Sequence, residues 1–242
     1  GNTASGWFYY GIYLSLDTDI TENDILVDEI YHPSIGADTL IENNINVIQE
    51  DNSGNIWIGT NGGLCRYNRE KNNFSRSIPI EGKKKGGFVI QDRIYSIFED
   101  ANNVLWIGTN AGLYQLTKSL KDSNLFKIKR FTKNSKKNSI HSNIVNSIVQ
   151  DEKGNIFIGT SKGLNLLSYD HTGMVKFENY TKYLNGKSYL TNQHITCLSL
   201  DYNGNVWIGT KNGLNKMFFN IITKIFCKIK YLAYFLKNFC PN

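Results

Sequence analysis

Residues 46–60 read Asn-Val-Ile-Gln-Glu-Asp-Asn-Ser-Gly-Asn-Ile-Trp-Ile-Gly-Thr, and three later stretches repeat this pattern without a gap. They end in the same Gly-Thr pair, at Thr109, Thr160 and Thr210. The glycines of these pairs stand at positions 59, 108, 159 and 209, so the copies follow one another at intervals of 49, 51 and 50 residues. In every copy an aspartate precedes this glycine by eight positions, and a Gly-Leu pair begins four positions after it. Self-similarity at a period of about 50 residues indicates a repeat architecture.

Each repeat has the residue pattern of β-structure. The segment Asp51 to Asn55 reads Asp-x-x-Gly-Asn, a tight turn in which the carboxylate accepts backbone N–H groups and Gly or Asn takes positive φ. A short apolar strand precedes this turn, and Ile-Trp-Ile-Gly-Thr, rich in β-branched and aromatic residues, follows it as a second strand. A third strand begins at Leu64, and a looser fourth is expected around 74–80, 126–131 and 177–180. Four strands in roughly 45–50 residues make a propeller blade. The predicted fold class is therefore all-β, with β-propeller blades of four antiparallel strands.

The pattern Glu-Asp-x-x-Gly-Asn-Ile-Trp-Ile-Gly-Thr-x-x-Gly-Leu resembles the two-component regulator propeller repeat, which builds the extracytoplasmic sensor of hybrid two-component systems, best known from gut Bacteroidetes. The segment from Ser139 to Ile144 also resembles that family's linker into the next blade. The resemblance covers about residues 40–217 and departs from the pattern at Phe157, where the other copies have Trp. It implies a periplasmic domain of an inner-membrane protein, with histidine kinase activity outside this chain. A parent ring of about seven blades, as the family suggests, would make the chain an incomplete ring.

The two ends depart from the repeat. Residues 1–40 are interpreted as a degenerate part-blade, because Gly11-Ile12 stands 52 residues before Gly63-Leu64 and residues 25–31 would supply an outer strand. Residues 41–217 hold the four repeats. Residues 218–242 are an atypical tail of apolar residues and lysines, without the roughly 20 uncharged residues that cross a bilayer. We interpret the tail as a strand followed by an irregular segment, in preference to an interfacial amphipathic helix.

Composition and the absence of signatures exclude several classes of protein. With 40% apolar and 20% charged residues, the chain is not intrinsically disordered. It contains no Gly-x-Ser-x-Gly, Walker or kinase signature, no Cys-x-x-Cys and no histidines at metal-ligand spacing, so neither metal nor cofactor is expected. The segment from Asp201 to Asn205 partly resembles a calcium loop but lacks the closing acid, so a satisfied hairpin turn is predicted. Cys197 takes the place of Val47 in its repeat and is expected to be a small buried residue.

Candidate binding residues lie in the connections between strands. In a blade, the connection from the fourth strand to the next first strand and the connection from the second strand to the third lie on one face of the disc. The connections from a fourth strand to the next first strand contain the polar residues Asn43, Asp92, Arg93, His141, Asn143, Gln193 and His194. The connections from a second strand to the third contain Asn61, Asn110 and Lys211. Amides and a few charges match the neutral donors and acceptors of a sugar, so we predict a carbohydrate site at these residues. Structural capping of turns is the alternative for the same residues.

The charge distribution bears on the ligand. The net charge is 27 − 21 = +6, and two groups of lysines, at 83–85 and at 133, 136 and 137, fall in connections that lead into first strands. We predict that they lie near the same face and favour an anionic oligosaccharide; solvated loops are the alternative. Nucleic acid is not expected, because the basic stretches lack interleaved aromatic residues.

The sequence thus predicts a ligand-sensing propeller module of a two-component sensor, which binds an oligosaccharide or mediates association between protomers. Self-association is expected, and membrane contact only through other parts of a parent protein. Two alternatives remain open. One is a propeller lyase or hydrolase, marked by carboxylates that converge at the channel mouth. The other is a purely structural interaction propeller, in which the polar side chains are consumed by backbone hydrogen bonds.

Overall fold

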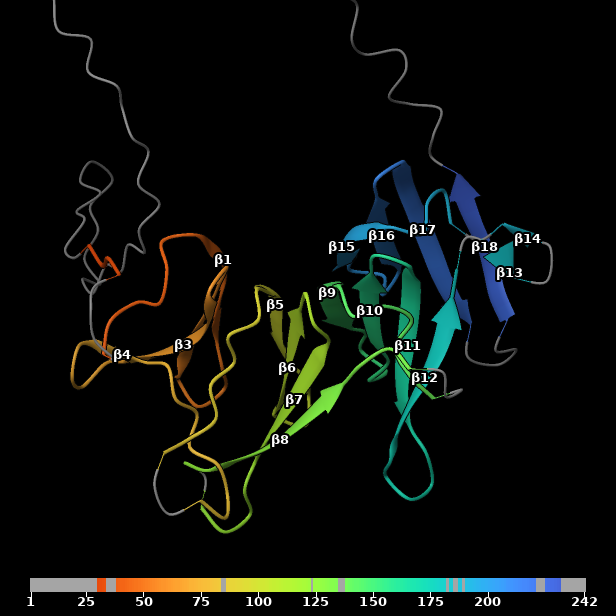
Figure 1. Cartoon of the computed structure of the whole chain (residues 1–242). Coiled ribbons are helices and arrows are strands. Elements are labelled where there is room, and N and C mark those ends of the chain that lie inside the picture. The colour runs from red at the N-terminus through yellow and green to blue at the C-terminus, as the bar shows by residue number, and fades with distance from the viewer. Residues whose placement is uncertain are drawn as a thin grey trace, which may run out of the picture.

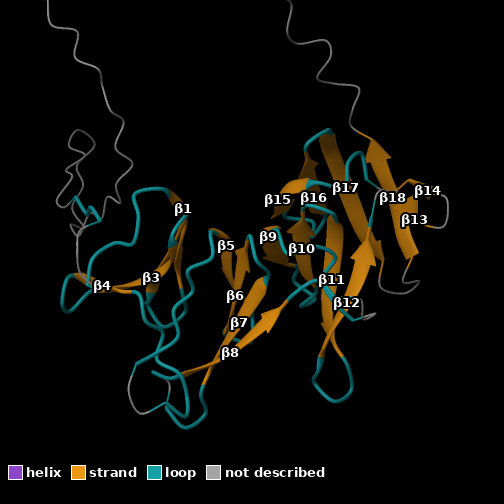
Figure 2. Cartoon of the chain, in the orientation of Figure 1, coloured by secondary structure: helices purple, strands orange, loops and turns teal. Residues whose placement is uncertain are grey.

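The computed structural model describes residues 30–33, 38–83, 86–122, 124–134, 138–181, 183–184, 187–188, 190–220 and 225–231. Over these residues the chain consists of strands and loops and contains no helix (Figure 2). Four antiparallel sheets, each of four strands consecutive in sequence, follow one another along the chain. The predicted all-β fold with four-stranded blades is confirmed.

The blades are numbered in chain order. Blade 1 consists of β1 (Ile45–Glu50), β2 (Ile56–Thr60), β3 (Gly63–Asn68) and β4 (Asn73–Ser75). Blade 2 consists of β5 (Ile94–Glu99), β6 (Val104–Thr109), β7 (Leu113–Lys118) and β8 (Phe126–Phe131). Blade 3 consists of β9 (Val145–Gln150), β10 (Ile156–Thr160), β11 (Gly163–Tyr169) and β12 (Val175–Tyr180). Blade 4 consists of β15 (Ile195–Leu200), β16 (Val206–Thr210), β17 (Gly213–Asn220) and β18 (Ile225–Tyr231). A small hairpin of β13 (Tyr183–Leu184) and β14 (Lys187–Ser188) lies between blades 3 and 4.

The repeated aspartate closes the first turn of each blade. Asp51 Oδ1 accepts the N–H groups of Ser53 and Asn55, both at 2.9 Å, and Asp51 Oδ2 accepts Trp57 Nε1 at 3.0 Å. Gly54 has φ = 78°, and in blade 2 Asn103 takes the same left-handed conformation, with φ = 58°, in place of glycine. The turn therefore fixes the indole of the second strand as well as its own backbone.

The glycine of the Gly-Thr pair allows neighbouring blades to approach closely. A Cβ atom at Gly59 would lie 2.5 Å from Ile94 Cγ2, and one at Gly159 would lie 2.6 Å from Ile195 Cγ2. Both isoleucines begin the first strand of the following blade. The repeat thus keeps glycine where the inner strands of two blades meet.

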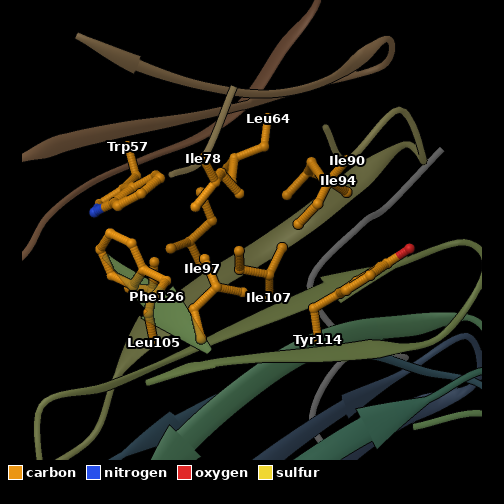
Figure 3. Packing of buried hydrophobic residues seen from close by; sticks show 11 residues of the cluster. Trp57, Leu64, Ile78, Ile90, Ile94, Ile97, Leu105, Ile107, Tyr114 and Phe126 are labelled. Carbon is orange, nitrogen blue, oxygen red and sulfur yellow. The ribbon is translucent and has the colours of Figure 1, made fainter. Parts of the chain in front are cut away.

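The core consists of layers between successive blades rather than of one central cluster. Figure 3 shows the first layer, in which Trp57 and Leu64 of blade 1 face Ile97, Ile107 and Phe126 of blade 2. Trp106 occupies the equivalent place between blades 2 and 3, and Phe157 does so between blades 3 and 4. The four blades lie in chain order along an arc, with blades 1 and 4 at its ends (Figure 1). Trp207 of blade 4 is only half-buried, whereas these three aromatic side chains are at most 1% exposed.

The outer strand of each of the first three blades is capped by the connection that enters that blade. The N–H of Phe74 in β4 donates to the carbonyl of Asp38 at 3.0 Å, and the N–H of Phe126 in β8 donates to the carbonyl of Pro79 at 2.9 Å. In blade 3 a side chain replaces the backbone: Asn138 Oδ1 accepts the N–H of Phe177, and its Nδ2 donates to the carbonyl of Val175. These bonds satisfy backbone groups that an outer strand would otherwise leave open.

The structure confirms or corrects several expectations about single segments. The tail enters blade 4 as a strand, because residues 225–231 form β18 and pair with β17. The fourth strand of blade 1 is shorter than expected, since β4 spans only Asn73–Ser75. Cys197 is exposed, so its expected burial is wrong; it lies on the side of blade 4 that, in the other blades, packs against the next one. The unit proposed around Gly11 lies outside the described residues. The strand proposed at 25–31 also lies outside them, except for its last two positions, Ile30 and Tyr31.

Candidate functional site

One face of the propeller carries both sets of connections in which the sequence places ligand contacts. We call it the connection face; the opposite turn face carries the first turn of each blade and the connection from its third strand to its fourth. One backbone hydrogen bond repeats in every blade and joins the two kinds of connection. The N–H groups of Asn61, Asn110, Ser161 and Lys211 donate to the carbonyls of Asn44, Arg93, Ile144 and His194 respectively, each at 3.1 Å. In each blade, the two kinds of connection that contain the predicted residues are therefore side by side. We call the residues equivalent to Asn43 the first column, and the residues equivalent to Asn61 the second column.

The column of Asn43, Asp92, Asn143 and Gln193 has different surroundings in each blade. Asn143 Oδ1 accepts the N–H of Lys133 at 2.6 Å, which is a structural capping bond. Asp92 Oδ2 accepts the hydroxyl of Tyr114 at 2.8 Å. Asn43 and Gln193 are exposed, and within the described part of the chain their side chains have no hydrogen-bond partner.

The second column is equally mixed. Asn110 Oδ1 accepts the N–H of Arg93 at 3.1 Å, and Asn61 Oδ1 accepts Asn46 Nδ2 at 2.9 Å. The side chains of Arg93 and Lys211 are exposed and form no ion pair with any described carboxylate. This face therefore carries both satisfied amides and polar groups open to solvent.

Both histidines of the connection face have a pKa below the usual value. Burial lowers the pKa of His141, and the charges of Lys133 and Lys162 lower it further. Burial and the charge of Lys211 act in the same direction on the pKa of His194. Burial and the nearby lysine charges thus favour the neutral form of each imidazole in the free protein.

A side chain of the third strand fixes the connection that enters the same blade. In blade 4, Asn215 Oδ1 accepts the N–H of Thr191 at 3.0 Å and its Nδ2 donates to Thr191 Oγ1 at 2.9 Å. In blade 3, Asn165 Oδ1 accepts the N–H of His141 at 2.8 Å. In blade 2 the equivalent third-strand residue is Tyr114, which reaches Asp92 instead. The sequence did not single out this position, although its change from blade to blade within a constant repeat is a signal that could have found it.

A pocket of about 450 Å³ lies along β8 on the outer side of blade 2. It is lined by Ile80, Glu81, Phe88, Tyr114, Phe126, Lys127, Ile128 and Arg130. Arg130 lies over the Tyr114 ring, 5.1 Å from its centroid, and forms an ion pair with Asp92 at 3.4 Å. Burial and the hydrogen bond to Asp92 raise the pKa of Tyr114 to about 12. The predicted residue Asp92 thus contacts two pocket residues, Tyr114 and Arg130, that sequence reasoning missed.

The predicted position of the first lysine group is wrong for its described member. Residues 79–81 lie along the outer edge of β8, where the N–H of Glu81 donates to the carbonyl of Phe126. Glu81 also accepts the hydroxyl of Ser119, in the connection between β7 and β8 on the turn face. Lys83 stands two residues after Glu81, and its N–H donates to the carbonyl of Ile80, so Lys83 lies towards the turn face and away from the connection face. Residues 84, 85, 136 and 137 lie outside the described residues. Lys133 lies on the connection face, as predicted, because its N–H donates to Asn143 Oδ1.

The Asp-x-x-Gly-Asn segments are hydrogen-bonded turns, as predicted. In blade 4, Asp201 accepts Asn205 Nδ2, Trp207 Nε1 and two backbone N–H groups, so its oxygens are occupied by the turn itself. Among the described residues no group of three His, Cys, Asp or Glu side chains has the arrangement to hold a metal ion. The same part of the chain contains no helix of the length and apolarity that a membrane crossing needs.

Comparison with known proteins agrees with the blade geometry. The model of the family described as two component regulator propeller matches residues 39–62, 89–111, 139–162 and 189–212, which is one match in each blade. No curated protein sequence matches the chain.

Two solved structures of similar fold are extracellular domains from Bacteroides thetaiotaomicron. That of the hybrid two component system BT4673 is 26% identical over 75% of this chain, with a TM-score of 0.57. That of BT3049 is 24% identical over 79%, also with a TM-score of 0.57, and this likeness concerns the fold alone. The chain spans 22% and 24% of these two proteins. Each of the four blades therefore carries a two component regulator propeller repeat, and the fold is similar to that of the extracellular domain of a hybrid two component system.

Proposed function

We propose that the chain is the ligand-binding propeller of a periplasmic two-component sensor, and that it binds an oligosaccharide on its connection face without chemical turnover. The observation that carries this proposal is the set of exposed polar side chains on that face without intramolecular partners among the described residues: Asn43, Arg93, Gln193 and Lys211. The similarity to an extracellular domain of a hybrid two component system supports the periplasmic location.

The chemistry of the face suits a sugar better than an apolar ligand. A sugar hydroxyl both donates and accepts hydrogen bonds, and a carboxamide such as that of Asn43 or Gln193 offers both functions. The cluster of Asp92, Tyr114 and Arg130 adds charged groups beside the aromatic wall of the β8 pocket. Pockets with apolar walls and a few convergent polar groups are typical ligand sites.

Signalling by such a module requires different affinities for two arrangements of the protomers. A ligand shifts an equilibrium only by the difference between its affinities for the two states. We therefore propose that the oligosaccharide changes how propellers associate, and that an output domain outside this chain responds.

Isothermal titration calorimetry with neutral and acidic oligosaccharides tests the proposal. The double variant N43A/Q193A should weaken binding at least tenfold, because both exposed carboxamides are lost. Asn203→Ala is the matched control, since Asn203 is an equally exposed amide on the turn face of blade 4. Failure of every oligosaccharide to bind a monodisperse, cooperatively melting chain would refute the function.

The absence of turnover needs its own measurement. Oligosaccharide recovered after prolonged incubation should show unchanged chain length and no new unsaturated ends by chromatography and mass spectrometry. Shortened products that disappear in an Asp92→Asn variant would instead assign the lyase or hydrolase alternative.

A further inference from the structure

Blades 3 and 4 differ at one buried hydrogen bond. In blade 4 both ends of the Asn215 carboxamide are used, one by the N–H and the other by the hydroxyl of Thr191. In blade 3 the residue equivalent to Thr191 is His141, which offers only its backbone N–H to Asn165. Asn165 is completely buried, and its Nδ2 has no hydrogen-bond partner. Blade 3 thus carries an unsatisfied buried donor directly beneath His141.

An amide flip does not remove the defect. If Asn165 were rotated, its NH₂ group would face the N–H of His141, and two donors would meet. Leaving a buried donor unpaired is costly, and such groups in native proteins are often found where function outweighs stability. Histidine at this position therefore costs blade 3 a hydrogen bond that threonine provides in blade 4.

Two lysines, Lys133 and Lys162, belong to the surroundings of His141. Lys133 lies at the same connection, because its N–H donates to Asn143 Oδ1 at 2.6 Å, and Lys162 follows Ser161, whose hydroxyl lies 2.8 Å from that of Ser142. The charges of both lysines act on the imidazole. Both lysines are exposed, and neither has a carboxylate within ion-pair distance among the described residues. The adjoining β12 carries two charged side chains, Lys176 and Glu178, and the carboxylate of Glu178 accepts the hydroxyl of Tyr180. Two lysines and an imidazole thus lie at the same connections, and among the described residues the imidazole ring has no hydrogen bond and neither lysine has an ion-pair partner.

We propose that Lys133, His141 and Lys162 form an anion subsite that receives a carboxylate or sulfate group of the bound oligosaccharide. The proposal rests on the proposed function and specifies its ligand: the sugar carries a negative charge, and blade 3 holds that group. Uronates and sulfate esters share the anionic oxygens that the two ammonium groups and a protonated imidazole recognise.

Binding at this subsite has a measurable electrostatic consequence. In the free protein, burial and the two lysines hold the pKa of His141 below its usual value. An anion between the lysines reverses the local field and favours the imidazolium, which can then donate to the ligand. The ligand should therefore bind with uptake of a proton, and more tightly at pH 6 than at pH 8.

Nuclear magnetic resonance titration of the histidine ring protons tests the subsite in the whole chain. Three probes are compared: a glucuronate-containing disaccharide, a sulfated disaccharide and their neutral parent. We expect a charged probe to raise the pKa of His141 by about one unit, and the neutral parent to leave it unchanged. His171, exposed on the turn face of blade 3, supplies the control signal, which should not respond to any probe. The responding charged probe distinguishes a carboxylate ligand from a sulfate ligand.

Matched variants link the response to the cluster. K133Q/K162Q should abolish the effect of the charged probe, whereas Lys153→Gln, an exposed lysine of the turn face of the same blade, should preserve it. His141→Thr should lose the preference for pH 6 and raise the melting temperature by about 2–4 °C, because threonine restores the partner of Asn165. A cooperative melt of this variant shows that lost binding is not lost folding.

The outcomes separate this inference from the proposed function. Binding of a neutral oligosaccharide, with the His141 signal unmoved by either charged probe, overturns the anion subsite and keeps the function. Absence of binding by all oligosaccharides overturns both. Equal loss of the response in K153Q and K133Q/K162Q would show a non-specific charge effect and would also overturn the subsite.

Discussion

At the scale of the residue, the aspartate of each repeat links a turn to a core. Asp100 is 1% exposed and accepts the N–H groups of Asn102 and Val104, as well as Trp106 Nε1 at 2.8 Å. In blade 3 the side chain of Phe157 has no N–H to donate, so Asp151 retains only the bonds of its own turn. The presence of Phe instead of Trp at position 157 therefore changes the hydrogen bonding of Asp151, six residues earlier.

The two aspartates should differ in their contribution to stability. We expect Asp100→Ala to lower the free energy of unfolding by about 3 kcal/mol, because it leaves the buried indole N–H and two turn amides unpaired. Asp151→Ala should lower it by about 1 kcal/mol less, since no indole depends on Asp151. Urea denaturation of both variants measures the difference. Equal losses would show that the indole bond contributes nothing.

The same aspartates make stability depend on pH. Burial tends to raise the pKa of Asp51, but hydrogen bonds from Trp57 and Asn55 and the charge of Lys118 outweigh it and hold the pKa below the usual value. Hydrogen bonds from Asn205 are the largest cause of the lowered pKa of Asp201. A lowered folded-state pKa gives stability that is present above the ordinary value of about 3.9 and lost as the pH falls through the folded-state pKa.

We therefore expect the wild type and Asp51→Asn to converge in stability as the pH falls. The variant should be less stable at pH 7, because its amide NH₂ faces the indole N–H of Trp57, and the gap should narrow below about pH 4. Melting temperatures at pH 7, 5, 4 and 3 provide the measurement. A gap of constant size across this range would contradict the assigned cause.

At the scale of the element, the outer strands depend on the connections that precede their blades. Phe74, Phe126 and Phe177 lie in β4, β8 and β12, and each has its N–H accepted by such a connection. Blade 3 relies on one side chain for this purpose, because Asn138 imitates a strand by both donating and accepting. A single substitution can therefore open the edge of β12.

Asn138→Ala should fray β12 locally. We expect the Phe177 amide to exchange with solvent about tenfold faster, corresponding to the loss of roughly 1.4 kcal/mol of local protection. The Phe126 amide is the internal control, since a backbone carbonyl caps it and the substitution leaves that bond intact. Hydrogen exchange followed by mass spectrometry resolves the two strands. Acceleration at both positions would indicate global destabilisation instead.

The regular elements could be predicted from sequence, and the irregular ones could not. The first three strands and the first turn of each blade recur with the period, so their alternation and turn residues are visible four times over. The contact of residues 79–81 with β8 occurs once and does not recur with the period, and the predicted position of Lys83 was wrong for that reason. Tyr114 and Arg130 escaped notice because they meet Asp92 only through the pairing of β7 with β8.

At the scale of the whole molecule, one face of blade 4 lies at the end of the arc and is more exposed than the layers between blades. Trp207 is half-buried, and Leu214 and Cys197 are exposed on blade 4. Their equivalents in blade 1 (Trp57, Leu64 and Val47) pack into the layer against blade 2. The exposure of Cys197, which was expected to be buried, follows from its place on this end face and not from its strand.

This end face should promote self-association. We expect the chain to form dimers or larger species at micromolar concentration, because contiguous exposed apolar patches are rarely tolerated in monomers. Leu214→Glu should shift sedimentation velocity profiles towards the monomer and make Trp207 fluorescence easier to quench with acrylamide. Leu120→Glu is the control, since Leu120 is 99% exposed on the turn face of blade 2. A monomeric wild type would contradict the prediction.

The caps of the outer strands have a consequence for synthesis on the ribosome. Asp38, Pro79 and Asn138 all precede the blades that they protect. A nascent chain therefore already possesses the cap when the outer strand of each of the first three blades emerges, so none of these three blades is completed with its outer edge uncapped. The apolar layer behaves in the opposite way, since Trp57, Trp106 and Phe157 stay uncovered until the following blade arrives. During elongation, misassembly is therefore expected from incorrect stacking between blades rather than from incorrect strand pairing. At each stage the exposed apolar surface belongs to the blade synthesised last.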